Sequence, residues 1–428
     1  QWWEHNMGKV SLFWGLVFFV PFMMGFGLET AVYNLLHIYV VDYIPFIILL
    51  GGLFVIAGGI IVRGTLIGTP CFNALLLAVG SVLASVVGTT GAAMLLIRPL
   101  IRANARRQTK VHTIIFFIFM VCNIGGSLTP IGDPPLFLGF LHGVPFFWTL
   151  NLLPMYLVNI GILLGVYFLL DSYYYKKENI LLQQVTPAAN AEAKISVGGL
   201  YNVIFLAGVI GAVILSGVFC HHPLFYDAAS DSTKGIPIMT SHGHTLVMPW
   251  INIVRDFFIL LMALLSYKIT PLTLRRENHF TWGPIKEVAI LFAGIFATIV
   301  PAMAILQARG GELGVTTPAQ FFWATGLLSS FLDNAPTYLT FTTLAGSLGE
   351  TVGVWTDLGT INPAVLTAIS CGAVFMGANT YIGNAPNFMV RSIAEENNIK
   401  MPSFFGYMGW SLLILIPLFI LNTWLFFM

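Results

Sequence analysis

A polar, glycine-rich segment interrupts two strongly apolar stretches of this chain at matching places. The segment GSLTPIGDPPLF at residues 126–137 recurs as GANTYIGNAPNF at residues 377–388, and six of the twelve positions are identical. A helix broken by glycine and proline leaves backbone groups unsatisfied in lipid, so such breaks occur where the backbone lines a cavity or is buried in protein. Two breaks at corresponding places in two halves are the best sequence indication of the binding site of a secondary transporter.

The composition places these stretches in a membrane. Hydrophobic residues make up 57% of the 428 residues and charged residues only 9%, whereas soluble domains are about 25% charged. Apolar windows of about 20 residues recur along the chain, so we expect an all-α polytopic membrane protein in the lipid bilayer. The formal net charge of +1 gives the chain no general attraction to nucleic acid.

Each half is expected to contain a re-entrant helical hairpin with a polar centre, followed by a broken transmembrane helix. The expected ranges are 1–170 for the first half with its hairpin at 71–100 and broken helix at 111–141, 171–199 for a cytoplasmic linker, and 200–428 for the second half with its hairpin at 318–346 and broken helix at 364–395. The second half has three spans before its hairpin and the first has two. We therefore expect one further helix upstream of Gln1.

The positive charges predict opposite orientations for the two halves. The loop at 98–110, after the first hairpin, contains five Lys and Arg residues, whereas the corresponding loop at 347–363 contains none. By the positive-inside rule, the first hairpin opens to the cytoplasm and the second to the outside, in an integral protein that we expect in a bacterial inner membrane. Inverted-topology repeats with paired broken helices are typical of an alternating-access carrier.

Hydroxyl, amide and carboxylate side chains cluster at the hairpin centres and at the breaks. Such an all-oxygen set suits a hard cation such as Na⁺, and no Cys/His cluster accompanies it, so we expect no transition metal and no cofactor. Helix N-termini at the breaks could instead face an anion. The candidate binding residues are Ser85, Thr89, Thr90, Ser127 and Thr129 in the first half, and Ser330, Asn334, Thr337, Asn379, Thr380 and Asn384 in the second.

Asp133 and Asp333 are the two deeply placed carboxylates, one in each half. An ionised carboxylate is costly in the membrane interior unless it is paired, hydrated or neutralised by a cation. Each is therefore a candidate for exchanging a proton for a bound cation. The alternative is that either aspartate caps a half-helix by accepting backbone N–H groups.

Other charged residues are expected to lie in solvated positions without a role in binding or coupling. The five residues Glu29, Asp42, Asp171, Arg255 and Asp256 fall near span ends, where we expect a solvated position. The histidine-containing loop at 220–244 lacks tight ligand spacing, so we expect a solvated extracytoplasmic loop.

Two segments resemble a known group of transporters. The sequence NIGGSLTPIGD at 123–133 and the sequence SSFLDNAPT at 329–337 resemble motifs of NhaD-type sodium/proton antiporters. These belong to the wider ion transporter superfamily of arsenite permeases, citrate carriers and divalent-anion/sodium symporters. The sequence GANTYIGN at 377–384 looks more like the permease and citrate-carrier branches.

The resemblance implies a transport domain built from the hairpins and broken helices, often with a dimeric scaffold, so a homodimer is expected. It carries family cation sites over to Ser85, Thr89 and Ser127 in the first half and to Ser330, Asp333, Asn334, Asn379 and Thr380 in the second. An aspartate at the second hairpin centre favours a cation and disfavours a nearby di- or tricarboxylate, because like charges repel strongly in a low dielectric.

The leading expectation is secondary transport, with antiport of Na⁺ or Li⁺ against H⁺. The main alternative is a Na⁺- or H⁺-coupled carrier of a small anion such as citrate, a dicarboxylate or arsenite. An enzyme is not expected: an intramembrane aspartyl protease would need a Gly-x-Gly-Asp motif, and the text before Asp133 is Pro-Ile-Gly. A channel would be distinguished by unitary currents.

Overall fold

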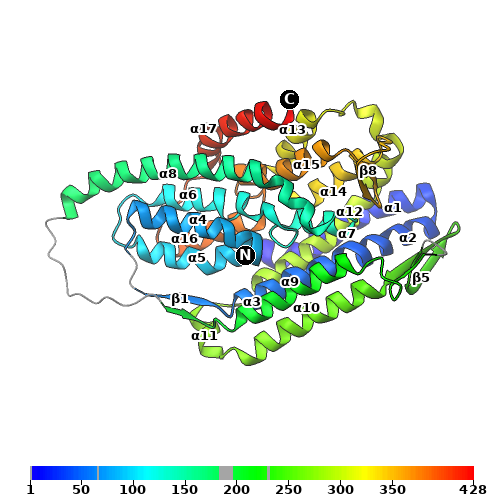
Figure 1. Cartoon of the computed structure of the whole chain (residues 1–428), viewed down its shortest axis with the longest axis horizontal. Coiled ribbons are helices and arrows are strands. Elements are labelled where there is room, and N and C mark those ends of the chain that lie inside the picture. Colours follow the sequence, from blue (N-terminus) through cyan, green and yellow to red (C-terminus); the bar gives the residue numbers. More distant parts are fainter. Residues whose placement is uncertain (1, 65–66, 183–195, 229–231) are drawn as a thin grey trace.

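The computed structural model describes residues 2–64, 67–182, 196–228 and 232–428. Eight helices in this described part are long and apolar enough to cross a membrane, by length and composition. The protein is an all-α polytopic membrane protein. Figure 1 shows the long helices running along the longest axis, with α8 on one long edge and α10 on the opposite edge.

The described part of the first half contains two apolar spans, a helix pair, a broken helix and a final long span. Its elements are α1 Trp2–Phe26, α2 Leu28–Ile38, the π-helical turn η1 Tyr39–Tyr43, α3 Ile44–Ala57, β1 Ile61–Arg63, α4 Pro70–Val87, α5 Thr89–Ala103, α6 Val111–Met120, the 3₁₀ turn η2 Ile124–Leu128, α7 Pro134–Leu141, η3 Phe146–Leu152 and α8 Leu153–Leu182. The helix α8 continues into the segment expected to be the linker, and residues 183–195 of that segment lie outside the described residues.

The described part of the second half contains a matching helix pair and broken helix. Its elements are β2 Ser196–Gly198, α9 Asn202–Val218, β3 Tyr226–Asp227, β4 Ser232–Thr233, β5 Gly235–Ser241, β6 His244–Pro249, α10 Trp250–Ile269, α11 Leu272–Glu277, α12 Gly283–Arg309, η4 Gly310–Leu313, α13 Pro318–Ser329, α14 Asn334–Gly346, β7 Val354–Thr356, β8 Gly359–Ile361, α15 Pro363–Met376, η5 Gly377–Asn379, α16 Ala385–Glu396, α17 Phe404–Asn422 and η6 Thr423–Phe427.

The strands form small antiparallel pairs. β1 pairs with β2, β3 with β4, β5 with β6, and β7 with β8. Figure 1 shows β1 and α11 in the left half of the view, and β5 and β8 toward its right end. Part of the loop expected to be solvated at 220–244 is thus folded into strands.

Burial separates a peripheral set of helices from a central one. In the apolar window of Asn6–Phe26 only 11% of the residues are buried, whereas in Val111–Leu128 the share is 89%. The helix α1 packs against α12, and α3 packs against α10. An apolar helix that the protein leaves uncovered must be covered by lipid, while the broken helix is covered by protein, as non-helical backbone at membrane depth requires.

The expectation that four of the span-end charges are solvated is wrong. Asp42, Asp171, Arg255 and Asp256 are 1%, 0%, 3% and 4% exposed. They are tolerated inside because each has an oppositely charged neighbour: Asp171 lies 2.7 Å from Arg107, Asp42 lies 2.8 Å from His142, and Arg255 lies 2.8 Å from Asp256. The sequence positions hid these partners, since two of the three pairs join distant segments. Glu29 is exposed as expected.

Candidate functional site

The first helix pair turns sharply at a glycine. α4 ends and α5 begins at Gly88, whose φ of 82° lies in a region that side chains strain to enter. The turn places Thr89 at the first position of α5, and its backbone N–H donates to the carbonyl oxygen of Gly132 at 2.8 Å. The tip of this hairpin is therefore fastened to the first break.

Both hairpins are fastened to their breaks by the same hydrogen bond. The hydroxyl of Thr129 donates to the backbone carbonyl of Ser85, and the hydroxyl of Thr380 donates to the backbone carbonyl of Ser330. Thr129 and Thr380 occupy the same position in the repeated segment. These four candidate residues therefore position the breaks, because their hydroxyl or carbonyl groups are used within the fold.

The paired glycines of each break explain why glycine recurs there. A Cβ atom added at Gly132 would lie 2.2 Å from the carbonyl oxygen of Gly126, and one added at Gly383 would lie 2.6 Å from that of Gly377. Real Cβ atoms do not approach a carbonyl oxygen so closely. The break thus folds back on itself, and the sequence repeat records this geometry twice.

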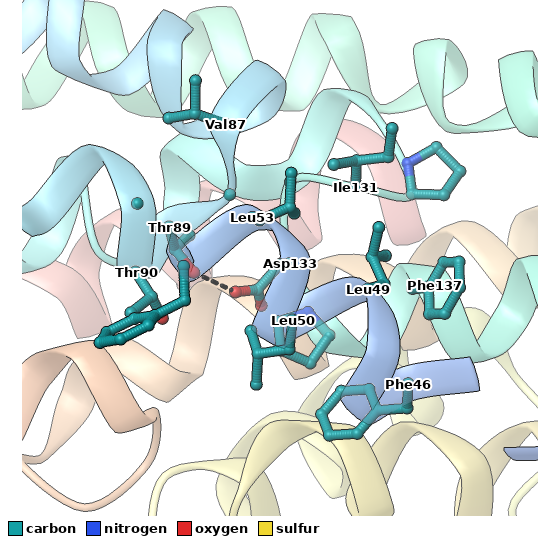
Figure 2. Close-up of a pocket in the computed structure, with 16 residues that line it drawn as sticks. Phe46, Leu49, Leu50, Leu53, Val87, Thr89, Thr90, Ile131, Asp133 and Phe137 are labelled. Atoms are coloured by element: carbon teal, nitrogen blue, oxygen red, sulfur yellow. Dashed lines mark hydrogen bonds between the residues drawn. The ribbon is translucent and has the colours of Figure 1, made fainter. Parts of the chain in front are cut away.

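Asp133 accepts hydrogen bonds from three side chains of three other elements. Thr89 Oγ1 donates to Oδ1 at 2.9 Å, Asn384 Nδ2 donates to Oδ1 at 3.1 Å, and Asn334 Nδ2 donates to Oδ2 at 2.6 Å. Asp133 is 1% exposed. Figure 2 shows Asp133 and Thr89 pointing toward each other. We call Asp133, Thr89, Asn334 and Asn384 the Asp133 cluster.

Four helix N-termini meet in this cluster. Asp133 is the N-cap residue of α7 and Asn384 that of α16, while Thr89 and Asn334 are the first residues of α5 and α14. The N-terminal end of each helix carries about half a positive charge, which favours a nearby anion. The arrangement therefore supports an ionised Asp133 carboxylate in an otherwise apolar interior.

The two aspartates have different local roles. Asp133 makes no capping bond to α7 with its side chain. Asp333 caps α14, because its Oδ1 accepts from the backbone N–H of Ala335 at 3.1 Å, and it is half-buried. Capping was the alternative considered for either residue, and it applies to Asp333. Capping leaves the other carboxylate oxygen of Asp333 available for further contacts.

The sequence predicted two separate sites, one in each half, whereas the structure brings residues of both halves together in one cluster. Asn334 and Asn384 of the second half bind Asp133 of the first, so one cluster draws on both halves. Asn379 donates to Ser330 Oγ at 2.9 Å and stays near the second break. Ser127 and Thr337 donate only to carbonyl oxygens of their own turns, Ile124 and Asp333.

Two asparagines that sequence reasoning did not select connect the two breaks. Asn123 Nδ2 donates to Asn387 Oδ1 at 2.8 Å, and Asn387 Nδ2 donates to the carbonyl oxygens of Gly377 and Thr380. Both are fully buried. The available signal for Asn387 was its spacing of three residues from Asn384, which puts both on one face of α16.

Within the part of the chain that the structure describes, two amide oxygens of the candidate residues have no hydrogen-bond partner. Asn334 Oδ1 and Asn379 Oδ1 are both buried and unpaired. A buried acceptor without a partner costs about 1–3 kcal/mol, and an oxygen ligand to a cation would remove that cost. Amide oxygens are ligands that suit a hard cation.

A small cavity lies beside Asp133. It has a volume of about 30 Å³ and is lined mainly by apolar side chains of α3 and α7, including Leu49, Leu53 and Phe137, together with Thr89 and Thr90. Figure 2 shows Thr90 on the same side of the cavity as Thr89. Among the lining residues in the described chain, Asp133 is the one with a charged side chain. This space suits a ligand of about the size of one water molecule.

Comparison with known protein families gives a match over nearly the whole chain. Residues 1–427 match the sequence model of a protein family described as "Putative citrate transport". No curated protein matches the chain. The match covers both breaks, both hairpins and the peripheral helices.

Proposed function

Because the chain belongs to this citrate-transport family, we propose that it is a secondary transporter whose coupling centre is Asp133, and that it exchanges Na⁺ or Li⁺ for H⁺. The observation that carries the proposal is the Asp133 cluster: a buried carboxylate with three neutral donors and no cationic side chain among its hydrogen-bond partners. A carboxylate held in this way can be neutralised by either a proton or a metal cation, so the two ligands compete for it.

The unpaired oxygens of Asn334 and Asn379 are the proposed additional cation ligands. Asp333 is proposed as a second coupling group, with Ser85, Thr129, Ser330 and Thr380 holding the breaks in position. In this proposal the hairpins and broken helices move together against the peripheral helices. This movement exposes the coupling centre to each side of the membrane in turn. This role resembles that of NhaD-type antiporters.

The second candidate is a Na⁺- or H⁺-coupled carrier of a small anion such as citrate, a dicarboxylate or arsenite. It is favoured by the family description and by the convergence of four helix N-termini, which attract anions. Against it, Asp133 already occupies the position where the N-termini favour a negative charge. A substrate carboxylate there would meet a like charge in a low dielectric.

Proton flux in proteoliposomes containing a pH dye separates the two. Na⁺, Li⁺, K⁺ and citrate are added in turn to wild type, Asp133→Asn and Glu350→Gln, the last being a control at an exposed loop carboxylate. We expect Na⁺ or Li⁺ alone to drive proton movement in wild type and the control and not in Asp133→Asn. Silence to cations together with Na⁺-dependent uptake of labelled citrate would overturn the exchange proposal and establish the anion carrier.

Sidedness and assembly are further proposals. We propose an inner-membrane homodimer with the loop at 98–110 in the cytoplasm. Arg106 is exposed, so Arg106→Cys should react with an impermeant maleimide only after the cytoplasmic face is opened. Labelling from outside in intact cells would reverse the orientation. Light scattering of the detergent-solubilised protein would test the dimer.

A further inference from the structure

Three titratable side chains from three elements meet at the C-terminal end of α7, the end opposite Asp133. His142 is the C-cap residue of α7, Asp42 lies in η1, and Asp357 lies in the turn between β7 and β8. His142 Nδ1 hydrogen-bonds Asp357 Oδ1 at 2.7 Å, and His142 Nε2 lies 2.8 Å from Asp42 Oδ1. We call these three residues the His142 bridge.

The bridge joins the helix of the coupling centre to two other parts of the protein. α7 is eight residues long and has Asp133 before its first residue and His142 after its last. Asp42 belongs to the span Leu28–Ala57, whose α3 part packs on the peripheral helix α10. Asp357 follows α14, which begins at Asn334. The backbone N–H of Asp357 also donates to the carbonyl oxygen of His142 at 3.1 Å.

The bridge borders a cavity that is large enough to hold water. The cavity has a volume of about 230 Å³, and its lining includes His37, Asp42, His142 and Asp357. That volume holds several water molecules. Asp357 has a side chain that is 44% exposed, while His142 and Asp42 are 3% and 1% exposed. Protons can therefore reach a buried imidazole through water and an exposed carboxylate.

The positions of the two carboxylates favour the doubly protonated ring. A neutral imidazole has one donor and one acceptor nitrogen, whereas the imidazolium donates from both. Both nitrogens of His142 face carboxylate oxygens, so a neutral ring would place a lone pair against one of them. The contact with Asp42 is an ion pair without a hydrogen bond. In the described chain, no group of three or more His, Cys, Asp or Glu residues is arranged to hold a metal.

The charges around His142 favour its cationic form. Burial alone lowers the pKa of His142, but the carboxylates of Asp42 and Asp357 raise it by more, so the pKa lies well above its ordinary value. A raised pKa gives the folded contact full strength at low pH and weakens it as the pH rises through the raised value. The other titratable groups facing the cavity are His37 and Tyr33 of α2, and α12 contributes the uncharged Gln307.

We propose that His142 is a second proton-binding site, separate from Asp133, and that its protonated form, supported by Asp357, holds α7 against Asp42 and keeps this end of the transport path closed. Loss of the proton at alkaline pH releases α7. This inference rests on the proposed movement of α7 during transport. The bridge would make Na⁺/H⁺ exchange depend on the external pH, since the charge pattern predicts that this end of the protein faces the extracytoplasmic side.

Two readouts on full-length protein test the bridge. The first is hydrogen–deuterium exchange of residues 134–144 and 353–361 in lipid nanodiscs from pH 6 to 10, corrected for the intrinsic pH dependence of exchange. The second is the rate of Na⁺-driven proton flux over the same range. The variants are His142→Gln, His142→Arg, Asp357→Asn and the control His244→Gln, which changes an exposed histidine of β6.

We expect the corrected hydrogen–deuterium exchange rate of residues 134–144 and 353–361 to rise at least threefold across an alkaline transition, in wild type and in the control variant. His142→Gln should show the faster exchange at all pH values, and its flux relative to wild type should be several-fold higher at pH 6.5 and equal at pH 9. His142→Arg should show slow exchange throughout, because arginine stays charged. Asp357→Asn should move the transition to lower pH, and its exposed side chain makes misfolding a minor concern.

A pH-independent exchange rate in wild type would overturn the proposal, as would a His142→Gln variant with the wild-type transition. The exchange readout does not need transport. If cations drive no proton flux but the hydrogen–deuterium exchange transition is present in wild type and lost in His142→Gln, the Na⁺/H⁺ exchange proposal fails and the His142 bridge proposal stands. If cations drive proton flux but the hydrogen–deuterium exchange transition is absent, the His142 bridge proposal fails and the Na⁺/H⁺ exchange proposal stands.

Discussion

The two breaks are alike in backbone and different in charge. At the matching position of the repeated segment the first break has Asp133 and the second has Asn384, and the Asn384 side chain donates to the Asp133 carboxylate at 3.1 Å. The hairpin tips differ in the opposite sense, with Gly88 in the first and Asp333 in the second. A repeated backbone thus builds four convergent helix N-termini, and unequal side chains put one carboxylate at their centre and a second at its edge.

The largest expected effect comes from removing the central charge. In Asp133→Asn, both proton and cation lose their common ligand, so cation-driven proton flux should fall at least 100-fold, equivalent to about 2.7 kcal/mol or more in the transport barrier. The amide fits the same space, and the protein should fold. Flux above a tenth of wild type would show that coupling lies elsewhere.

Exchanging the two side chains sharpens the comparison. Asn384→Asp alone places two carboxylates in contact, and one must take up a proton, so flux should fall at least tenfold. Asp133→Asn combined with Asn384→Asp restores a single carboxylate among the same N-termini and should recover flux above either single variant. Recovery would show that the charge in the cluster matters more than which break supplies it. A double variant as inactive as Asp133→Asn would give the first break a role that the second cannot take.

The shared backbone predicts equal sensitivity of the two breaks to added bulk. Gly132→Ala and Gly383→Ala each force a Cβ atom against a carbonyl oxygen, which should destabilise the protein by about 1–3 kcal/mol. Gly161→Ala is the matched control, because nothing lies within 4 Å of its added Cβ. Thermal unfolding in detergent, followed by near-UV circular dichroism, measures the difference. Equal melting temperatures for Gly132→Ala and Gly161→Ala would contradict the close backbone approach.

The smallest stability effect is expected at the second hairpin tip. Asparagine caps a helix about as well as aspartate, whereas alanine costs about 1 kcal/mol, so Asp333→Asn should keep the wild-type melting temperature and Asp333→Ala should lower it. Flux separates capping from coupling, since Asp333→Asn removes the charge and keeps the cap. Normal flux in Asp333→Asn would limit Asp333 to capping, and reduced flux would support its proposed coupling role.

Local sequence patterns were sufficient to predict an all-α polytopic membrane protein, while its division into two repeats with re-entrant hairpins and broken helices stays a prediction. The segment 71–100 covers all but the outer ends of the helix pair α4–α5, and the segment 318–346 matches the pair α13–α14. The repeated segments contain the non-helical backbone at Thr129–Asp133 and Thr380–Asn384. These patterns are local because proline, glycine and apolar run length act through the backbone of neighbouring residues. The same patterns did not show that Asp42 and Asp171 are buried, because their partners His142 and Arg107 lie on other segments.

By itself, the sequence determined that this chain is a helical membrane protein, and it indicated two similar breaks with Asp133 in the first and Asn384 at the matching position of the second. Run length, glycine pairs and residue type carry that information without reference to distant segments. Only the tertiary structure decided that Asn334 and Asn384 bind Asp133, that Asp333 caps α14, and that His142 lies between two carboxylates. Hydrogen bonds and ion pairs of this kind depend on positions fixed to within about an ångström, and helix packing sets those positions.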